Sequence, residues 1–463
     1  MELINLCFLK SFFPLCLKIS LIIAIFKKGD PNNPSDYRPI SLLIFLSKIL
    51  ERAIFSRTSQ FCSENFIITT AQFGFTKGKS VQDALINLTE FIYTSLNSKD
   101  HCIAVQIDYQ KAFDTVQHGI LLRKLEKYGI CDGPLKLFAS FLSGRTQAVR
   151  YNKKLSSSRA VSVGIPQGTV LGPLLFLLYV NDMPAFSKEC GVTLFADDTT
   201  LCFRGPSYPE LVTRTCSELT KFVTWSRANR LSVHPDKTSY MVFSNRAFDI
   251  SLPVTMNQTT IKIEQSIKIL GVHLDNKLKF SVHISETCKK VSKNLGIIFK
   301  LRDNLPTRTL RTLYYSLLYP YFLYCISVWG GTFLNHLHPL VILQKRAIRV
   351  INRSSYFAHT TPLFLSSRIL KLEDVYTYNL AMYMFDRRLD PEFSINHNHN
   401  TRNHSNQVLP PYERLTLTQH SVKYSACKIW NQLPESLKNI ESKCSFGRNL
   451  KNFLFDKYSS DNN

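Results

Sequence analysis

The chain has 463 residues, enough for two or three separate hydrophobic cores. Hydrophobic residues make up 44% of it and charged residues 20%, which is a globular composition and excludes a disordered or fibrous protein. An excess of 57 Lys and Arg over 34 Asp and Glu leaves a net charge of +23, which favours a polyanionic partner, either nucleic acid or an anionic membrane surface.

The N-terminal residues are apolar, but they do not have the pattern of a signal peptide or a membrane span. Glu2 precedes any basic residue, Lys10 and Lys18 interrupt the apolar run, and Pro14 divides it. Residues 17–26 are therefore predicted to form a buried strand. The abrupt start, without a polar lead-in, predicts that an upstream part is missing.

The 12 cysteines are scattered, without a Cys-x-x-Cys pair, and most lie in apolar runs. This pattern is typical of reduced core cysteines and not of disulfides or zinc ligands. An intracellular protein of the cytoplasm and nucleus, neither secreted nor bound to a membrane, is expected.

Basic residues flank the first turn-rich segment, with Lys27 and Lys28 before it and Arg38 after it. They are either phosphate ligands, which Arg38 could hold in a bidentate manner, or ordinary surface charges. Residues 42–61 then have helical spacing, and Ser41 is the candidate N-cap.

Glycines, aromatics and lysines alternate over residues 72–80, before a helix predicted over residues 81–96. The mixture is typical of a loop that lets a phosphate or a template approach the backbone. A strand follows at residues 103–107, and Asp108 stands at its end. Helices near residues 119–128 and 134–142 and strands at residues 147–151 and 160–163 complete this part.

Gly and Pro residues set a turn over residues 164–173, and residues 174–180 form an apolar helix behind it. Gln167 and Gly168 lie at the start of this helix, where a glycine beside a polar side chain lets a base or a sugar approach closely. The alternative is a plain loop-to-helix junction.

Two adjacent carboxylates, Asp197 and Asp198, interrupt an apolar stretch that reads as strand, two-residue turn and strand. Neighbouring side chains of a straight strand point to opposite faces, so the pair can serve one site only from a turn. Together with Asp108 they would make a three-carboxylate site. Two carboxylates about 4 Å apart repel by roughly 4 kcal/mol at an effective dielectric constant of 20, so such a site requires cations. Hard oxygen ligands of this kind suit Mg²⁺.

The remaining chain becomes helical. A helix over residues 210–227, a strand at residues 240–243 and a hairpin at residues 267–275 precede helices over residues 282–301, 307–318 and 340–351. Their basic residues would form either a nucleic-acid track or a solvated helix face: Arg308, Arg311, Lys345, Arg346 and Arg349. A polar linker is predicted over residues 396–406, where His397, His399 and His404 lie among Asn residues, and a small helical tail follows it.

The order of these motifs resembles the reverse transcriptase of a non-LTR (LINE-type) retrotransposon of the jockey-like kind, over nearly the whole chain. The matching stretches are residues 26–43, 72–88, 106–122, 163–184, 194–201, 228–243 and 269–284. Ala24 stands where the family commonly has Pro, and Tyr109-Gln110 replaces the usual Leu-Ser. Members usually carry an upstream endonuclease, which is not expected within these residues, so the chain is expected to extend supplied primers without nicking DNA.

The resemblance implies an α+β right-hand polymerase with fingers, a palm with an antiparallel sheet, and a helical thumb. Residues 1–275 would form fingers and palm, residues 276–390 the thumb, and residues 391–463 a linker with a small helical C-terminal segment. The implied cofactor is a pair of Mg²⁺ ions, with Mn²⁺ as a substitute. The implied partners are dNTPs, an RNA template and a DNA primer, within a ribonucleoprotein that contains the element RNA.

The same resemblance assigns roles to individual residues. Asp108, Asp197 and Asp198 would be catalytic metal ligands, and Lys237 would be the acid for the leaving pyrophosphate. Phe113 would lie beneath the incoming sugar and exclude a 2′-hydroxyl. The remaining nucleotide-binding positions would be Lys28, Arg38, Tyr109, Gln167 and Gly168.

Two alternatives to an RNA-directed DNA polymerase of a retrotransposon remain open. One is a polymerase of the intron-maturase or telomerase type, against which the jockey-like C-terminal motifs Val328-Trp329-Gly330 and Gln344-Lys345-Arg346 argue. The other is a catalytically inactive remnant that acts only as an RNA-binding protein. The retained carboxylates argue against a remnant, and the missing upstream part argues for one.

Overall fold

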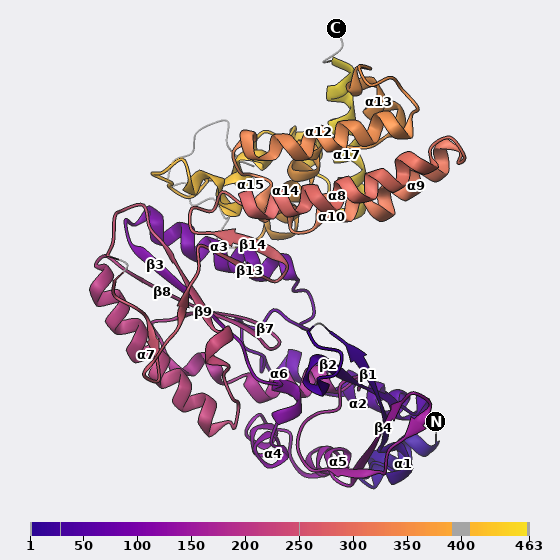
Figure 1. Cartoon of the computed structure of the whole chain (residues 1–463), viewed down its shortest axis with the longest axis vertical. Helices are drawn as coiled ribbons and strands as arrows, with labels where there is room; N and C mark the ends of the chain where they lie inside the picture. Colours follow the sequence, from indigo (N-terminus) through magenta and orange to yellow (C-terminus); the bar gives the residue numbers. More distant parts are fainter. Residues whose placement is uncertain (1, 28, 250, 391–407, 461–463) are drawn as a thin grey trace.

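The computed structural model of the protein describes residues 2–27, 29–249, 251–390 and 408–460. Figure 1 shows three parts along the long axis: an N-terminal part at one end, a central sheet, and a helical part that contains the C-terminus at the other end. In the described ranges no helix is both long enough and apolar enough to span a bilayer.

The central sheet has the strand order β12-β9-β3-β8-β7. Its strands are β3 (His101–Ile107), β7 (Gly191–Phe195), β8 (Asp198–Gly205), β9 (Ser239–Phe243) and β12 (Lys262–Ile263). Neighbouring strands are antiparallel except for β12, which runs parallel to β9. The antiparallel sheet predicted from the sequence is therefore confirmed.

Strand β3 is buried on both faces, and its side chains alternate between two hydrophobic cores. Ile103, Val105 and Ile107 belong to one core, and Cys102 and Ala104 belong to the other. The alternation follows from the two-residue period of an extended strand. The central sheet is therefore the layer that the two cores share.

Helices cover both faces of this sheet. Helices α6 (Gly172–Val180) and α7 (Tyr208–Ala228) contribute to the core of Ile103, and α3 (Val81–Asn97) contributes to the core of Cys102. The α3 helix begins with a capping box, in which the Ser80 side chain accepts a hydrogen bond from the Asp83 backbone N–H. The core of Cys102 continues into the C-terminal helices, so the helical part is joined to the sheet by apolar packing.

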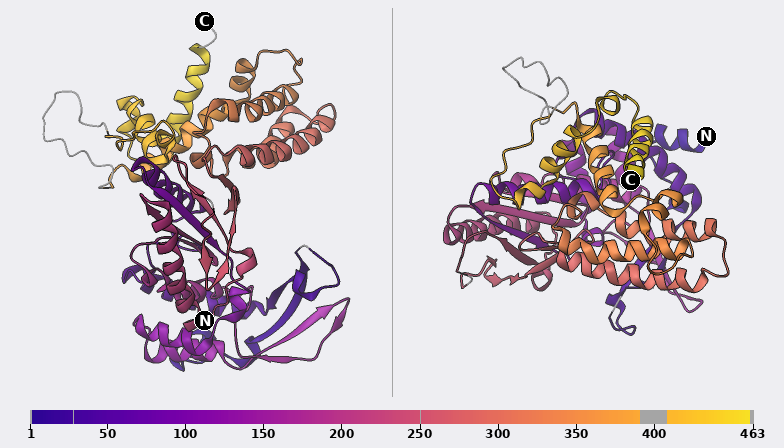
Figure 2. Two further views of the ribbon diagram at one scale, coloured as in Figure 1. Left: turned by 60° about the vertical axis from the view of Figure 1, so that its left-hand side comes forward. Right: turned by 90° about the horizontal axis from the view of Figure 1, so that it is seen from above.

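A second sheet lies in the N-terminal part and has the order β2-β1-β4-β5, with β6 paired to β4. Its strands are β1 (Ile19–Phe26), β2 (Tyr37–Leu43), β4 (Arg145–Tyr151), β5 (Lys154–Leu155) and β6 (Arg159–Val161). The strand predicted over residues 17–26 is present as β1, but the prediction that it is buried was wrong. Ile19, Ile25 and Phe26 are exposed, because the sheet projects from the body of the molecule (Figure 2).

The helices of the N-terminal part are α1 (Glu2–Leu9), α2 (Phe45–Glu64), α4 (His118–Lys127) and α5 (Asp132–Leu142). The sequence did not predict α1. The prediction that Ser41 caps α2 was wrong, since Ser41 lies in β2 and Ile44 is the N-cap residue, without a side-chain cap. The Ser41 backbone N–H is instead engaged with the Gln167 carbonyl at 2.8 Å.

A hairpin of β13 (Ser266–Ile269) and β14 (Val272–Asp275) leads into the helical part. The helices there are α8 (Ser281–Leu301), α9 (Thr307–Leu317), α10 (Tyr319–Leu323), α11 (Ile326–Trp329), α12 (Leu334–Ile351), α13 (Thr360–Ser367), α14 (Leu372–Arg387), α15 (Val422–Asn431), α16 (Glu435–Lys438) and α17 (Lys443–Ser460). Trp329 is fully buried, and its indole N–H donates to the Tyr324 carbonyl at 2.8 Å. The linker predicted over residues 396–406, with its histidines, lies outside the described residues.

A buried carboxylate joins α2 to the start of α6. Glu51 is fully buried and accepts hydrogen bonds from the backbone N–H groups of Val170 and Leu171 at 2.6 and 3.2 Å and from the Ser47 hydroxyl at 2.9 Å. Burial raises the pKa of Glu51, whereas these hydrogen bonds and the charge of Arg145 lower it. The carboxylate thus fixes the turn that precedes α6.

We expect Glu51→Gln to lower the free energy of unfolding by about 1–3 kcal/mol, because the buried N–H groups of Val170 and Leu171 exchange a charged acceptor for a weaker neutral one. Urea unfolding followed by circular dichroism measures the change. Glu64→Gln, an exposed position on the same helix, is the matched control. Equal unfolding midpoints for the two variants would contradict the assigned role of Glu51.

Candidate active site

The predicted hairpin that carries two adjacent carboxylates is present. Phe195 of β7 pairs with Asp198 of β8, so the turn consists of Ala196 and Asp197. Ala196 has a φ of +57°, the left-handed conformation that residues other than Gly rarely adopt. This turn places the carboxylates of Asp197 and Asp198 at one end of the central sheet.

The register between β3 and β8 brings the third carboxylate to the same end. Ile107 is the partner of Thr199, and the next positions in this antiparallel register are Asp108 and Asp198. The backbone of Asp108 is also held by the segment that leads into β9. Its N–H donates to the Thr238 hydroxyl at 3.4 Å, and its carbonyl accepts from the His234 N–H at 2.8 Å. The three predicted carboxylates are therefore neighbours.

The pKa values show that these carboxylates repel one another. Removal from water raises the pKa of Asp198 to about 6, and the negative charges of Asp197 and Asp108 add to the rise. Desolvation and the charge of Asp108 also raise the pKa of Asp197. An excess of negative charge at this end of the sheet favours the binding of cations.

The donor set fits Mg²⁺, which prefers carboxylate oxygens and keeps part of its water shell. Within the part of the chain that the structure describes, no three His, Cys, Asp or Glu side chains already converge into a complete ligand cluster. Asp108, Asp197 and Asp198 would hold the metal after their side chains turn toward it.

Lys237 lies beside these carboxylates. It ends the 3₁₀ turn η5 (Pro235–Lys237), and its ammonium nitrogen is 3.9 Å from a carboxylate oxygen of Asp108. The side chain is 64% exposed, so the ammonium group can reach a bound molecule as well as Asp108. The role of Lys237 as an acid for the leaving pyrophosphate stays a prediction.

Two basic residues of the N-terminal sheet face the same site. The positive charges of Lys27 and Arg38 both lower the pKa of Asp197, which places them within electrostatic reach of it. Arg38 lies on β2 and is exposed, as the sequence analysis required of a phosphate ligand. The predicted Lys28 lies outside the described residues, and its neighbour Lys27 is the lysine that acts on Asp197.

The two predicted aromatic residues differ in their surroundings. Phe113 is half-buried in the turn η3 (Ala112–Thr115), and its ring stacks on Phe176 of α6 with centroids 4.3 Å apart. Tyr109 is only 9% exposed and packs against Phe222 in the core. The sequence did not predict that the hydrophobic core holds the Tyr109 ring. Because Tyr109 follows Asp108 in the chain, its backbone and not its ring lies next to the carboxylates, and nucleotide binding at this position stays a prediction.

Gln167 and Gly168 are held between two other segments. The Gln167 amide donates to the Asp114 carboxylate at 3.0 Å, and its carbonyl accepts from Ser41 N–H. Gly168 has a φ of +117°, and an added Cβ would lie 2.6 Å from the Ser41 carbonyl oxygen. The sequence predicted that a base or a sugar approaches Gly168 closely. In the structure the group that lies close to this glycine is the backbone of β2.

The sequence analysis missed the role of Gln72. Its side-chain carbonyl accepts from the backbone N–H groups of Gly74 and Ala196 at 2.8 and 3.1 Å, so it supports the turn that carries Asp197. Gln72 is almost fully buried, and an added Cβ on Gly74 would lie 2.5 Å from the Ala196 nitrogen. The sequence analysis interpreted residues 72–80 as a loop that contacts a phosphate or a template, and it did not predict this support of the turn.

Lys79 of the same loop is also used internally. Its ammonium group donates to the carbonyls of Thr70 and Gln72 at 2.6 and 2.9 Å and lies over the Phe73 ring. The loop of residues 72–80 thus braces the carboxylate turn, and Lys79 is not a free phosphate ligand.

These features define a right-hand polymerase. The antiparallel sheet with three carboxylates at one end is the palm, the projecting sheet with its basic residues belongs to the fingers, and the helical part is the thumb. Residues 25–274 match the family model of reverse transcriptases, described as RNA-dependent DNA polymerases. The chain belongs to this reverse transcriptase family, and the predicted resemblance to the jockey-like non-LTR group is confirmed.

Three of the similar proteins come from mobile elements of Drosophila melanogaster. The chain is 30% identical over 391 residues to the probable RNA-directed DNA polymerase from transposon BS, covering 81% of this chain and 42% of that protein. It is 31% identical to the corresponding probable polymerase of the X-element, covering 79% and 41%, and 30% identical to that of the mobile element jockey, covering 81% and 42%. The chain thus spans about two fifths of the length of these relatives.

Solved structures with a similar chain trace include two telomerases. The structure from Candida albicans, in complex with a fragment of telomeric RNA, has a TM-score of 0.41 and 13% identity and covers 80% of this chain and 68% of its own. The apo telomerase from Candida tropicalis has a TM-score of 0.43 and 12% identity and covers 81% and 67%.

Packing around the hairpin removes part of the hydration of the Asp198 carboxylate, but the residue is exposed, so solvent screens most of the effect on stability. We therefore expect Asp198→Asn to stabilise the folded protein near pH 7.5 by less than about 1 kcal/mol. The pKa of Asp198 is raised from 3.8 to about 6 on folding, so its charged form destabilises the folded state above that pH. The difference should shrink as the pH falls through 6 and vanish below the unfolded value of about 3.9. Thermal melts of the metal-free proteins across this range measure it, with Asp456→Asn as the control. Equal melting temperatures at neutral pH would show that Asp198 is not destabilised by its neighbours.

Proposed function

We propose that the protein is an RNA-directed DNA polymerase, which transfers nucleotides from dNTPs to the 3′-hydroxyl of a DNA primer on an RNA template. The single observation that carries the proposal is the β3–β8 register, which makes Asp108 the neighbour of Asp197 and Asp198 at an accessible end of the palm sheet. Residues 1–275 would act as fingers and palm, residues 276–390 as the thumb, and residues 391–463 as a linker with a small helical C-terminal segment.

The proposed cofactor is a pair of Mg²⁺ ions held by Asp108, Asp197 and Asp198. Two such ions would stabilise the negative charge on the attacking and leaving oxygens during nucleotide transfer. The raised pKa values of Asp197 and Asp198 support this assignment. Burial and the neighbouring carboxylates make the charged forms unfavourable, and a bound cation would stabilise them. Mn²⁺ has the same preference for oxygen ligands and should substitute.

The chain's own basic residues would position the triphosphate. Arg38 is exposed and, with Lys27, lies within electrostatic reach of Asp197, so both can neutralise phosphate charge next to the metal ligands. Lys237, at 3.9 Å from Asp108, would donate a proton to the leaving pyrophosphate. Gln167 and Gly168 would line the nucleotide and template side of the same space.

Phe113 would select deoxyribonucleotides. Its stacking on Phe176 holds the ring in one position, and its turn follows Asp108 directly along the chain. A fixed ring beneath the sugar would clash with a 2′-hydroxyl, the group that distinguishes ribonucleotides. If the ring serves only the core, its removal should change stability and leave selectivity unaltered.

The second candidate function is an RNA-binding remnant without activity. It is supported by the net charge of +23, which does not require catalysis. Extension of an oligo(dT) primer on poly(rA) with Mg²⁺ separates the two candidates, since a remnant would bind this substrate but not extend it.

We expect Asp108→Asn and Asp198→Asn each to lower the rate of primer extension by at least about 10³-fold, because the loss of one carboxylate removes charge that holds the metal. Binding of the template–primer should remain, since these residues would hold the metal and not the nucleic acid. Single-turnover extension and fluorescence anisotropy measure the two properties, with Asp456→Asn as the control. Extension at the unmodified rate by either variant would remove the carboxylates from the mechanism.

We expect Phe113→Val to reduce the ratio of kcat/KM for dNTP over rNTP by about 10- to 100-fold, since one good steric contact contributes roughly 1–3 kcal/mol of discrimination. The ratio is measured by single-nucleotide incorporation. Phe66→Val, at a position that is 91% exposed, controls for the loss of a ring elsewhere in the fingers. A lower melting temperature with an unchanged ratio would assign Phe113 to core packing alone.

A further inference from the structure

Two loops of the candidate active site are joined by their backbones. The N–H of Ile165 donates to the Phe113 carbonyl at 2.9 Å. Gly164 has a φ of +86°, and a Cβ added there would lie 2.6 Å from the Asp114 carbonyl oxygen, so the two chains are in close contact. The turn that carries Phe113 therefore has a fixed position relative to the loop that carries Gln167.

A side-chain hydrogen bond adds to this backbone contact. The amide nitrogen of Gln167 donates to Asp114 Oδ1 at 3.0 Å, and both residues are half-buried. The backbone carbonyl of Gln167 accepts from the Ser41 N–H of β2 at 2.8 Å. Gln167 is thus held through its side chain by the Phe113 turn and through its backbone by the fingers sheet.

The chemistry of Asp114 decides which end of the Gln167 amide faces it. An ionised carboxylate only accepts hydrogen bonds, whereas a glutamine side chain has a donor nitrogen and an acceptor oxygen. An amide turned the other way would bring two acceptors into contact and would lose the hydrogen bond. The nitrogen therefore points to Asp114, and the oxygen Oε1 of Gln167 accepts no hydrogen bond from any residue that the structure describes.

The charge of Asp114 is balanced locally. Burial raises the pKa of Asp114, whereas the hydrogen bond from Gln167 and the positive charge of Lys111 lower it. These two neighbours therefore offset part of the cost of keeping the carboxylate charged away from water. The charged form of Asp114 and the orientation of the Gln167 amide thus support each other.

Asp114 is electrostatically separate from the three carboxylates of the palm. The negative charges that raise the pKa of Asp198 are those of Asp197 and Asp108, and the one that raises the pKa of Asp197 is that of Asp108. Asp114 does not contribute to either shift. It therefore does not belong with the proposed metal ligands, although it follows the proposed sugar-contacting residue Phe113 directly in the chain.

We propose that Asp114 is a positioning residue of the nucleotide site, which orients the Gln167 amide so that Oε1 is presented as a hydrogen-bond acceptor to a hydroxyl or amino group of the bound nucleotide. Asp114 touches neither the nucleotide nor the metal and acts only through Gln167. The inference rests on the proposed polymerase function, since it assigns a role within that site. The contact itself is tested without any need for activity.

The first experiment exchanges the two functional groups and measures thermal melting at pH 8. Gln167→Glu alone places a second carboxylate against Asp114 and should lower the melting temperature. Adding Asp114→Asn restores one donor and one acceptor in the reverse sense, and it should recover most of the loss. Gln167→Glu combined with Asp456→Asn, a change at an exposed position, is the control and should recover nothing. A swapped pair that melts no higher than this control would overturn the proposal.

The second experiment measures kcat and KM for dTTP in primer extension on poly(rA) with oligo(dT). Asp114→Ala should raise KM by about 5- to 10-fold with little change in kcat, the effect of losing one positioned hydrogen bond. Gln167→Ala and the double variant should show the same rise, because Asp114 acts through Gln167.

The swapped pair Asp114→Asn with Gln167→Glu retains an acceptor oxygen at position 167, so its KM should lie within about two-fold of that of the unmodified protein. This comparison also holds if Asp114→Ala does not fold. A lower melting temperature of Asp114→Ala with unchanged KM, or effects of the two alanine variants that add, would overturn the inference and leave the polymerase function intact. Failure of the unmodified protein to extend the primer would overturn the proposed function and, with it, the role assigned to Asp114.

Discussion

The register between β3 and β8 is the constraint on which the site depends. A shift by one residue would turn every side chain of β3 to the opposite face, exchanging Ile103 and Cys102 between the two cores. Burial on both faces makes such a shift costly, since each fully buried aliphatic side chain contributes about 1.5–3 kcal/mol. The same register makes Asp108 the neighbour of Asp198, so hydrophobic packing holds the carboxylates together against their repulsion.

Buried polar side chains connect the palm to segments far away in sequence. Glu51 of α2 accepts from the turn before α6, and Gln72 accepts from the turn that carries Asp197. Each satisfies backbone N–H groups that would otherwise be buried without partners, which costs about 1–3 kcal/mol per group. These two contacts join segments that are 119 and 124 residues apart in the chain, and they bring short motifs from distant parts of the sequence to one end of the central sheet.

Charge is distributed in opposite senses over the molecule. On the palm, burial and the charges of Asp197 and Asp108 raise the pKa of Asp198. On the thumb, burial and the positive charges of Arg311 and Arg368 lower the pKa of Lys451. Both arrangements cost folding free energy, and both are relieved by ligands of opposite charge. At the palm, the positive charges of Lys27 and Arg38 partly offset the negative charge around Asp197.

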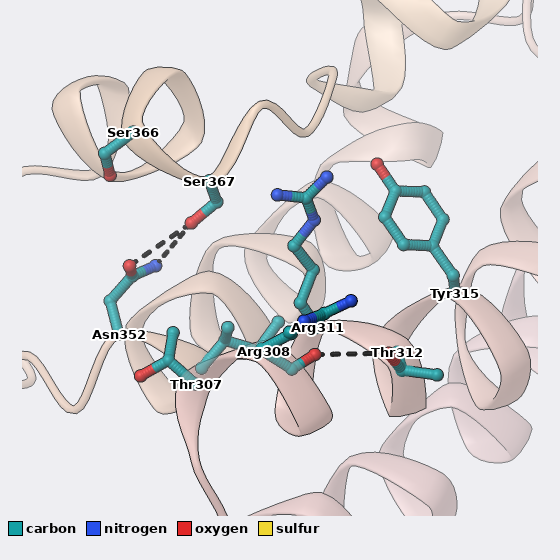
Figure 3. A pocket seen from close by; sticks show the side chains of 9 residues that line it. Thr307, Arg308, Arg311, Thr312, Tyr315, Asn352, Ser366 and Ser367 are labelled. Atoms are coloured by element: carbon teal, nitrogen blue, oxygen red, sulfur yellow. Dashed lines mark hydrogen bonds between the residues drawn. The ribbon is translucent and has the colours of Figure 1, made fainter.

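The sequence alone determined the family, the hairpin with its two carboxylates, the strand before Asp108 and most of the helices, because period-two and helical patterns and turn residues are local properties. It misjudged what depends on contacts between distant segments: the exposure of β1, the cap of α2, the burial of Tyr109 against Phe222, and the role of Gln72. The basic residues of α9 were equally consistent with a solvated face or a nucleic-acid track. Only the tertiary structure, which brings Arg308 and Arg311 of α9 together with Asn352 and Ser367 (Figure 3), showed that these two arginines line one pocket, because long-range contacts arise only when the chain is packed.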